Sequence, residues 1–406
     1  MSFDIQLTCK EFSDLSFSRR DKRFYKVFLE DSMVDYFPVC RFLIDDTEGL
    51  FSERTGYVEG LTFNVKIFDN VNLEFIESDF FWSDNTLEVS RGSSAYVNGI
   101  YEMYLTSALK RQDSIKSKAY KGRFSDIVKK IYSKYQFPYM PAEKNLFISQ
   151  CDNNDTWFQA NESDAELVDR ETGVCFSKSF PTSPFISFFN LRSEFYFMPF
   201  LEFFTSKQPK RTLFLAQDAT QKNSANYITA YSSDVTGATI KYPMYNMDNG
   251  YTNENGEFQT RNTTLADYAL KVDNNSKGII PLNKKELLVK RGNQQFGLVE
   301  STRLNNLRGK INASHREVLF GQELTIQTNA GIDLAAGDII STQIDSIYRD
   351  KKTNMLYTGK WLVLKHVLEF TPFDASEQPK SLLILVKPTI PIPDSHPLYN
   401  TFVKGK

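Results

Sequence analysis

The stretch MLYTGKWLVLKHVLEF, residues 355–370, decides how the rest of the chain is interpreted. Thr358, Gly359 and Lys360 form a turn signal between two apolar runs. Further along, the run SLLILV at residues 381–386 contains enough aliphatic side chains to predict a buried strand. These two segments therefore predict strands at the centre of a C-terminal β-structure.

The segment before this stretch completes the same unit. An apolar stripe predicts a helix over residues 295–310. Two candidate strands follow it, and Gly337 and Asp338 divide them. The order is helix, strand, strand, polar excursion, strand, turn, strand. It predicts a small closed or nearly closed β-barrel flanked by one helix.

Length and composition bound the rest of the molecule. The chain has 406 residues, which can hold about two to four domains of ordinary size. Its 34 Phe and 20 Tyr favour strands and interfaces and fit a β-rich subunit of an assembly, although a biased genome composition would give the same excess. The formal net charge of -2 argues against a large basic surface for duplex nucleic acid, but it allows a groove or lumen of one sign.

The cysteines and the apolar runs indicate the compartment. Cys9, Cys40, Cys151 and Cys175 lack the paired spacing of a zinc site. The first residues contain no apolar core of a signal peptide, so we expect buried, reduced thiols in a protein made in the cytosol. No apolar run reaches the length of a spanning helix, so we expect no membrane insertion by this chain.

Residues 1–110 are expected to form the strands of a sandwich or barrel. In residues 61–68, LTFNVKIF, apolar and polar side chains alternate, which predicts a half-buried strand with one wet face. Polar breaks are expected between the strands, one of them at residues 83–85. The candidate strands are residues 3–7, 36–44, 57–68, 73–81 and 98–109.

Residues 115–205 are expected to form an α+β insertion. Apolar side chains at helical spacing predict a helix over residues 124–135, with Ser125 or Asp126 as its N-cap. Ser163 and Glu166 fit the capping box of a second, short helix. The stripe of the first helix consists of Phe124, Ile127, Val128, Ile131, Tyr132 and Tyr135.

A third helix is expected in the Phe-rich part of this insertion. Ser183 followed by Pro184 predicts a helix that continues to about residue 193. Residues 194–198 and 201–204 would then form a hairpin around a proline.

The last parts of the chain are less periodic. Residues 206–280 are polar and loop-rich, with short strands expected at residues 212–216 and 225–231. The prolines of the tail exclude a central strand and predict an extended arm.

No residue pattern indicates catalysis. His315, His366 and His396 lack the spacing of a metal site or a triad, and no phosphate-binding glycine motif occurs. We therefore assign no catalytic, cofactor-binding or metal-binding residue, and we expect no cofactor and no enzymatic activity. For His366, in a strand-like run, a structural role is favoured over a pH-sensitive contact.

Aromatic residues at 185–204 could stack on bases beside Lys207, Lys210 and Arg211. A packed core followed by a polar loop is the favoured interpretation of that segment.

The order of the elements carries more information than any single motif. KGRF at residues 121–124 leads into a helix, Ser183 and Pro184 precede the Phe-rich run, and YTGKWLV at residues 357–363 follows AGDI at 336–339. Over roughly residues 1–390, this order resembles the central baseplate hub protein of contractile-tailed phages and the related hub region of type VI secretion spikes. The glycine, lysine, tryptophan and aliphatic run is its most specific local match.

The resemblance implies a β-rich α+β fold with two tube-protein-like β-barrels, flanking helices and an α+β insertion domain. Residues 206–280 would partly complete the first barrel. The expected domains are a first tube-like barrel at 1–114, the insertion at 115–205, a polar linking region at 206–280, a second tube-like barrel at 281–390 and a Pro-rich arm at 391–406.

The resemblance also implies a homotrimer in the baseplate of a virion tail. Three subunits with two barrels each would form a pseudo-sixfold ring that adapts a hexameric tail tube to a threefold spike. The implied partners are a central spike protein, a tail tube protein and a tape-measure protein, and DNA would pass through the lumen without specific binding. The alternatives are a virion receptor- or glycan-binding protein and, less favoured, a glycoside hydrolase, whose paired carboxylates would meet only in space.

Overall fold

The computed structural model describes most of residues 1–216 and shorter stretches of the rest of the chain. The described residues are 3–12, 14–18, 24–46, 60–69, 73–89, 99–138, 140–180, 183–216, 235–241, 251–252, 258–259, 322–328, 332–345, 359–370 and 380–387.

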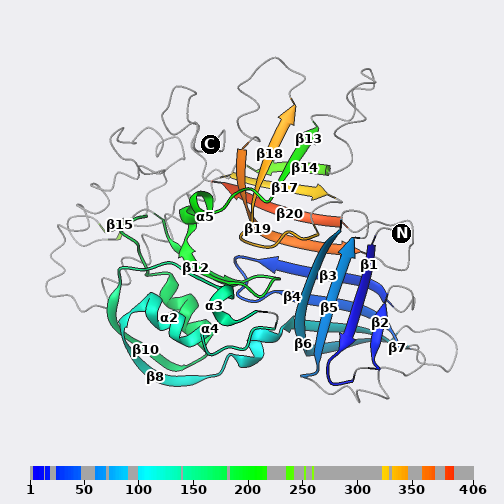
Figure 1. The fold of residues 1–406 in the computed structure, drawn as a ribbon, viewed down its shortest axis with the longest axis horizontal. Helices are drawn as coiled ribbons and strands as arrows, with labels where there is room; N and C mark the ends of the chain where they lie inside the picture. Colours follow the sequence, from blue (N-terminus) through cyan, green and yellow to red (C-terminus); the bar gives the residue numbers. More distant parts are fainter. Residues whose placement is uncertain are drawn as a thin grey trace.

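One large sheet of 13 strands carries the fold (Figure 1). Its N-terminal strands are β1 (Phe3–Cys9), β2 (Ser16–Ser18), β3 (Phe24–Ser32), β4 (Val39–Asp45), β5 (Thr62–Asp69), β6 (Glu74–Val89) and β7 (Gly99–Ser107). Its later strands are β13 (Arg211–Ala216), β14 (Val235–Lys241), β17 (Gln322–Thr328), β18 (Ile339–Asp345), β19 (Gly359–Phe370) and β20 (Lys380–Lys387). Neighbours follow the order β14-β17-β20-β19-β3-β4-β7-β6-β5-β1-β2, while β13 pairs with β18 and β18 with β19.

The alternating N-terminal strands are confirmed. Phe63, Val65 and Ile67 of β5 are fully buried, while the polar residues between them remain partly exposed. Strand β3 escaped prediction, and the break expected at residues 83–85 is wrong. Strand β6 continues through it with a register shift between Trp82 and Asp84, which accommodates polar residues inside a paired strand.

Strand β19 joins the two ends of the chain in one sheet. Along one edge it pairs first with β18, where Leu362 lies opposite Ile339, and then with β3, where Leu368 lies opposite Leu29. Its other edge pairs with β20.

The strands expected on either side of Gly337 and Asp338 are confirmed as β17 and β18, the strand expected after residue 360 as β19, and the strand expected at 381–386 as β20. The turn expected at residues 358–360 is wrong for Gly359 and Lys360, which belong to β19 and pair with β18. The helix expected at 295–310 and the strand at 225–231 lie outside the described residues.

Closed barrels at 1–114 and 281–390, like the other domain boundaries, stay predictions. The described strands β13 and β14, from the polar linking region, pair with β18 and β17 of the C-terminal group. The two-residue strands β15 (Tyr251–Thr252) and β16 (Phe258–Gln259) pair only with each other in this description.

The insertion packs beside the large sheet, in the cyan and green part of Figure 1. A 3-10 helix, η2 (Ala108–Gln112), leads into it. Its elements are β8 (Lys116–Arg123), α2 (Phe124–Tyr132), α3 (Ala142–Asn145), β9 (Leu146–Ile148), β10 (Asn154–Glu162), α4 (Asp164–Thr172), β11 (Phe185–Phe189), β12 (Phe195–Pro199) and α5 (Phe200–Ser206). Strands β8 and β10 form an antiparallel ribbon, and β12 lies between β11 and β9 in a second sheet.

Two helices of the insertion were predicted correctly. All six predicted stripe residues of α2 and the turn after it are buried. The predicted N-cap is wrong, because the N-cap residue is Arg123, which makes no side-chain capping bond, and Ser125 lies in the first turn. At α4, Ser163 and Glu166 form the expected reciprocal capping box.

The helix expected from Pro184 is a strand. Residues of β11 pair with β12, and all five side chains of β11 are buried. Phe185 and Phe189 face the core of the insertion, while Ile186 and Phe188 pack on the other side against a core that includes Leu362 of β19. A strand buried on both faces has a continuous apolar run instead of an alternating one, and that run mimicked a buried helix.

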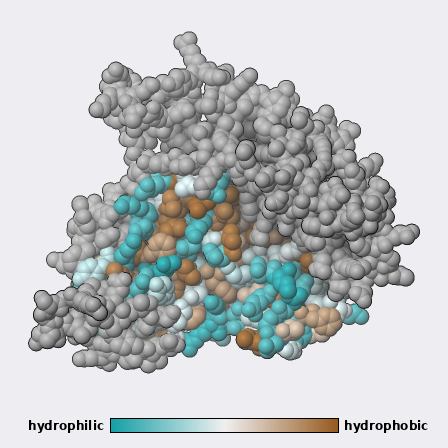
Figure 2. Space-filling view, turned by 180° about the vertical axis from the view of Figure 1, so that it is seen from behind, coloured by the Kyte–Doolittle hydropathy of each residue, from teal (hydrophilic) through white to brown (hydrophobic). Residues whose placement is uncertain are grey.

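The expected hairpin around Pro199 is wrong, because only its first half is a strand and its second half is a helix. Phe195 to Pro199 form strand β12, which pairs with β11 and not with the segment after it. The chain after Pro199 forms helix α5, whose Phe200 and Phe203 are buried. On the face drawn in Figure 2, hydrophobic residues lie in patches among hydrophilic ones.

Candidate functional site

The parts of the molecule meet at residues 332–338, IDLAAGD, which precede β18 and which we call the junction segment. Its apolar side chains belong to three different hydrophobic clusters. Ile332 and Ala335 pack into the N-terminal core, Ala336 packs beside β11 and β12, and Leu334 packs among the C-terminal strands. One short segment therefore fixes three cores relative to one another.

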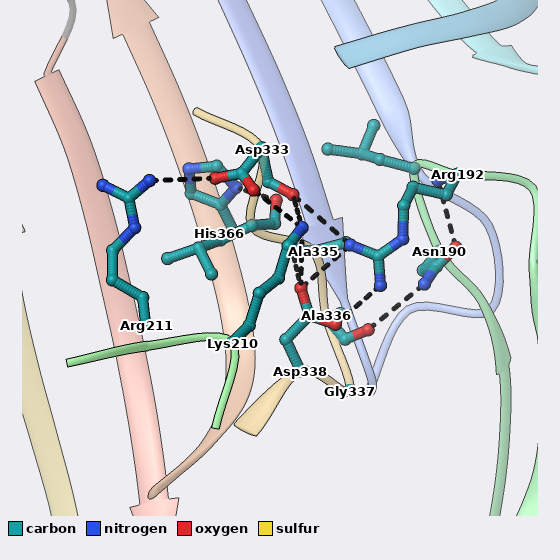
Figure 3. Close-up of polar contacts among 12 residues, drawn as sticks. Asn190, Arg192, Lys210, Arg211, Asp333, Ala335, Ala336, Gly337, Asp338 and His366 are labelled. Atoms are coloured by element: carbon teal, nitrogen blue, oxygen red, sulfur yellow. Dashed lines mark hydrogen bonds and ion pairs between the residues drawn. The ribbon is translucent and has the colours of Figure 1, made fainter. Parts of the chain in front are cut away.

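A buried ion pair connects the junction segment to the insertion. Arg192, in the turn between β11 and β12, donates from Nη1 to Asp338 Oδ2 over 2.9 Å and from Nη2 to Asp338 Oδ1 over 2.6 Å. Arg192 Nε also donates to Glu194 Oε2 over 3.2 Å. Figure 3 shows Arg192 reaching the segment from one side, with Lys210 and Arg211 on the other. A forked pair of this kind fixes orientation as well as distance.

This pair controls the charge of its carboxylates. Burial raises the pKa of Asp338, but Arg192, together with Lys210 and the amide of Ala335, outweighs burial and holds that pKa below its usual range. The same balance lowers the pKa of Glu194, which also accepts from Asn190 and Tyr196. Both acids therefore remain charged at neutral pH.

Cations from the α5–β13 connection bind the other side of the segment. Lys207 donates to the carbonyl oxygen of Gly337 over 2.8 Å, and its Nζ lies 4.0 Å from the centre of the Tyr196 ring. Burial lowers the pKa of Lys207 to about 8. Lys210 Nζ lies 2.9 Å from Asp333 Oδ2, and Arg211 Nη2 lies 3.4 Å from Asp333 Oδ1.

Asp31 of β3 holds the segment from the N-terminal sheet. Its Oδ2 accepts from the amides of Ala336 (2.8 Å) and Leu191 (3.1 Å), so one carboxylate oxygen joins the junction segment, the insertion and β3. Its Oδ1 has no hydrogen-bond partner within the described part of the chain. Burial raises the pKa of Asp31 to about 7, against smaller opposing effects of the two amides and Arg192.

His366 of β19 lies opposite Asp31 in the sheet register. Its Nδ1 lies 2.9 Å from the carbonyl oxygen of Leu334, and its Nε2 lies 3.1 Å from Ser381 Oγ. Because a carbonyl oxygen only accepts, Nδ1 carries the proton and Nε2 accepts from the serine. Burial lowers the pKa of His366 to about 4, so the ring is neutral at physiological pH and serves the structure.

Gly337 allows the segment to pass under the insertion. Its φ is +85°, and a Cβ at this position would lie 2.9 Å from the Phe188 ring and 3.2 Å from the Phe203 ring. Both the backbone conformation and the close approach therefore require glycine.

The polar groups of the junction serve to hold the parts of the fold together. Its two most buried acids, Asp31 and Asp338, already bind backbone amides or a guanidinium. Among the described residues, no group of three or more His, Cys, Asp or Glu side chains could hold a metal ion. Within the same ranges, no helix is long and apolar enough to cross a membrane.

The other sequence candidates lie elsewhere in the fold. The side chains of β11 and β12 are buried, so their aromatic rings offer no exposed face on which a base could stack. Lys207, Lys210 and Arg211 bind the junction segment instead. All four cysteines are buried, as predicted. Sequence reasoning missed the junction because Arg192 and Asp338 are 146 positions apart. The only local sign of the junction in the sequence is the pair of acids, Asp333 and Asp338, on either side of the small residues 335–337.

Comparison of the fold with solved structures identifies its type. No protein-family model and no curated protein matches the sequence. The 43 kDa tail protein of prophage MuSo2 from Shewanella oneidensis superposes with a TM-score of 0.52 at 11% identity, covering 96% of this chain and 98% of that one. The chain has the fold of phage tail proteins. The tail protein from Neisseria meningitidis MC58 gives a TM-score of 0.50 at 11% identity, covering 95% and 97% of the two chains.

Proposed function

We propose that this protein is a structural subunit of a phage tail, the baseplate hub. Three copies form a ring that adapts a hexameric tail tube to a threefold central spike. The ring contacts the spike protein, the tail tube protein and the tape-measure protein, and DNA passes through its lumen without specific binding. The protein is made in the host cytoplasm and ends up in the virion.

The observation that carries the proposal is the extent of the fold similarity. The match to the MuSo2 tail protein covers nearly all of both chains, so the whole architecture is shared and not one common module. A structural role also agrees with the junction, where buried charges are used to fasten three cores. An adapter between two assemblies needs such rigidity, because its neighbours must keep a fixed geometry.

The molar mass in solution tests the proposal. Light scattering at several concentrations should give about three times the 46.8 kDa of one chain, either alone or after addition of the spike protein. The mass of a single chain at every concentration, with each tail partner in turn, would contradict it. The Arg192→Met variant serves as a control, because a loosened fold that still trimerises would separate assembly from stability.

A further inference from the structure

Positive charge is concentrated in one segment of an otherwise weakly acidic chain. Residues 110–134 contain nine lysines and arginines and only two aspartates, whereas the whole chain has a net charge of -2. Most of these cations belong to β8 and α2 of the insertion. Placing so much like charge together is unfavourable unless something of opposite charge offsets it.

The fold brings several of these cations to one cavity. Lys116, Lys118 and Tyr120 alternate along β8 and so share the face of the strand that looks toward α2. Lys130 lies in the last turn of α2, and Lys134 follows just after the end of the helix. Together they line a cavity of about 180 Å³, completed by Gln112, Ile131, Tyr135 and Asp164.

The one carboxylate in the lining is already occupied. Asp164 is buried, and it accepts from Lys116 Nζ (2.5 Å), from Gln159 Nε2 (3.1 Å) and from Tyr135 Oη (3.5 Å). The nearby Asp113 accepts from the amide of Ala165 at the start of α4. Asp164 is therefore balanced by Lys116, and Asp113 is not among the residues that line the cavity.

Three lysines of the cavity remain in excess. Lys118, Lys130 and Lys134 are exposed, and in the described ranges they form no ion pair. Lys118 Nζ lies 5.1 Å from the centre of the Tyr120 ring, which keeps its charge at the mouth of the cavity.

We propose that this cavity binds a phosphate-type oxyanion. Lysine ammonium groups bind phosphate as point charges, and lysines placed around one cavity can contact several oxygens of a tetrahedral anion at once. The volume also suits a small anion, since a cavity of roughly 150 Å³ takes up benzene. This binding is independent of the role proposed for the whole chain.

Two sources of such a group are distinguishable. Titration calorimetry with inorganic phosphate, against sodium chloride of equal ionic strength, reports a free anion. Flotation with phosphatidylcholine vesicles, with and without phosphatidylglycerol, reports a lipid headgroup. Binding in either arm supports the proposal, and no binding beyond the chloride or phosphatidylcholine background in both arms would overturn it.

Matched charge variants locate the site. The triple variant Lys118→Gln, Lys130→Gln and Lys134→Gln should weaken binding at least tenfold. The control triple variant Lys121→Gln, Lys129→Gln and Lys144→Gln removes the same charge from exposed positions outside the cavity lining and should change binding less than twofold. Equal losses in the two variants would overturn the proposal. If the cavity triple variant fails to fold, the single variant Lys134→Gln, compared with Lys129→Gln, gives the same decision.

Discussion

Two joints hold the ends of the chain together, and they are built from different interactions. The first is the ladder between β19 and β3, where apolar residues such as Leu368 and Leu29 lie in register and the Lys26–Glu369 ion pair is about half exposed. The buried pair Asp31 and His366 in this ladder also contacts the junction segment. The second is the junction segment, where Asp338 and Asp31 are buried and the Arg192 side chain is 27% exposed. Both join the same parts of the fold.

The difference teaches where this protein is vulnerable. A strand ladder distributes its stability over many backbone hydrogen bonds and apolar contacts, so one side chain matters little. An ion pair with a buried carboxylate concentrates stability in two side chains, because removing one partner leaves an uncompensated charge away from water. We therefore expect single substitutions to act strongly at the junction and weakly at the ladder.

The largest effect is expected from Arg192→Met. This change removes the forked partner of the buried Asp338 carboxylate, which keeps the amide of Ala335 and the more distant Lys210. It should lower the free energy of unfolding by about 3 kcal/mol. Urea unfolding measures it. The control is Lys178→Met, which removes an exposed lysine whose Nζ lies 3.8 Å from Asp152 Oδ1 and should cost less than about 1 kcal/mol. Equal costs for the two variants would remove the distinction between the joints.

The next effect is expected from Gly337→Ala. The new Cβ combines a positive φ with a clash against Phe188, and the expected cost is about 2–4 kcal/mol. Gly60→Ala is the matched control, because Gly60 has nearly the same φ (+88°) but open space around its Cα. It should cost only about 1–2 kcal/mol for the backbone. Melting curves of both variants compare the two costs, and a cost at Gly337 no greater than at Gly60 would show that the junction is loosely packed.

A pH effect is expected from Asp31→Asn. The pKa of Asp31 rises from 3.8 to about 7 on folding, so between these values the folded protein holds a proton that the unfolded chain has released. The free energy of unfolding therefore falls as pH rises through this window. Asparagine still offers an oxygen to the two amides but has no charge to bury. Between pH 4 and pH 8, the free energy of unfolding of the variant should rise relative to that of the wild type by an amount on the order of 3 kcal/mol.

The comparison of variant and wild type is essential here, because His366 acts in the opposite direction. Its pKa falls from 6.5 to about 4 on folding, so its contribution is complete above pH 6.5 and is lost as pH falls toward 4. Urea unfolding of both proteins across the range cancels this shared term. A constant difference between them at every pH would contradict the buried charge at Asp31.

The smallest effect is expected at the ladder. Lys26 Nζ lies 2.6 Å from Glu369 Oε1 across β3 and β19, and both side chains are about half exposed. A double-mutant cycle with Lys26→Gln and Glu369→Gln should give a coupling of about 0.2–1 kcal/mol, which about 1 M salt should abolish. A coupling above that range, or one that salt leaves unchanged, would mean that the ladder also depends on charge.

Secondary structure was predicted correctly from the sequence where an element has one face exposed to water. Strand β5 and helix α2 each have one wet face, and their polar side chains record the period of the backbone. Strand β11 has no wet face, so its run of apolar residues carries no period, and the preceding Ser183 and Pro184 suggested a helix start. In the structure, the Ser183 hydroxyl accepts instead from the amide of Leu201, at the start of α5.

The candidate site shows the same limit more sharply. The sequence by itself determined a β-rich chain, the positions of most strands of the large sheet, the amphipathic helix α2 and the capping box of α4, because each depends on neighbours a few residues apart. Only the tertiary structure decided that β19 joins both ends in one sheet and that Asp31, Arg192 and Asp338 meet. Contacts between residues more than a hundred positions apart leave no local pattern, since their partners are chosen by packing.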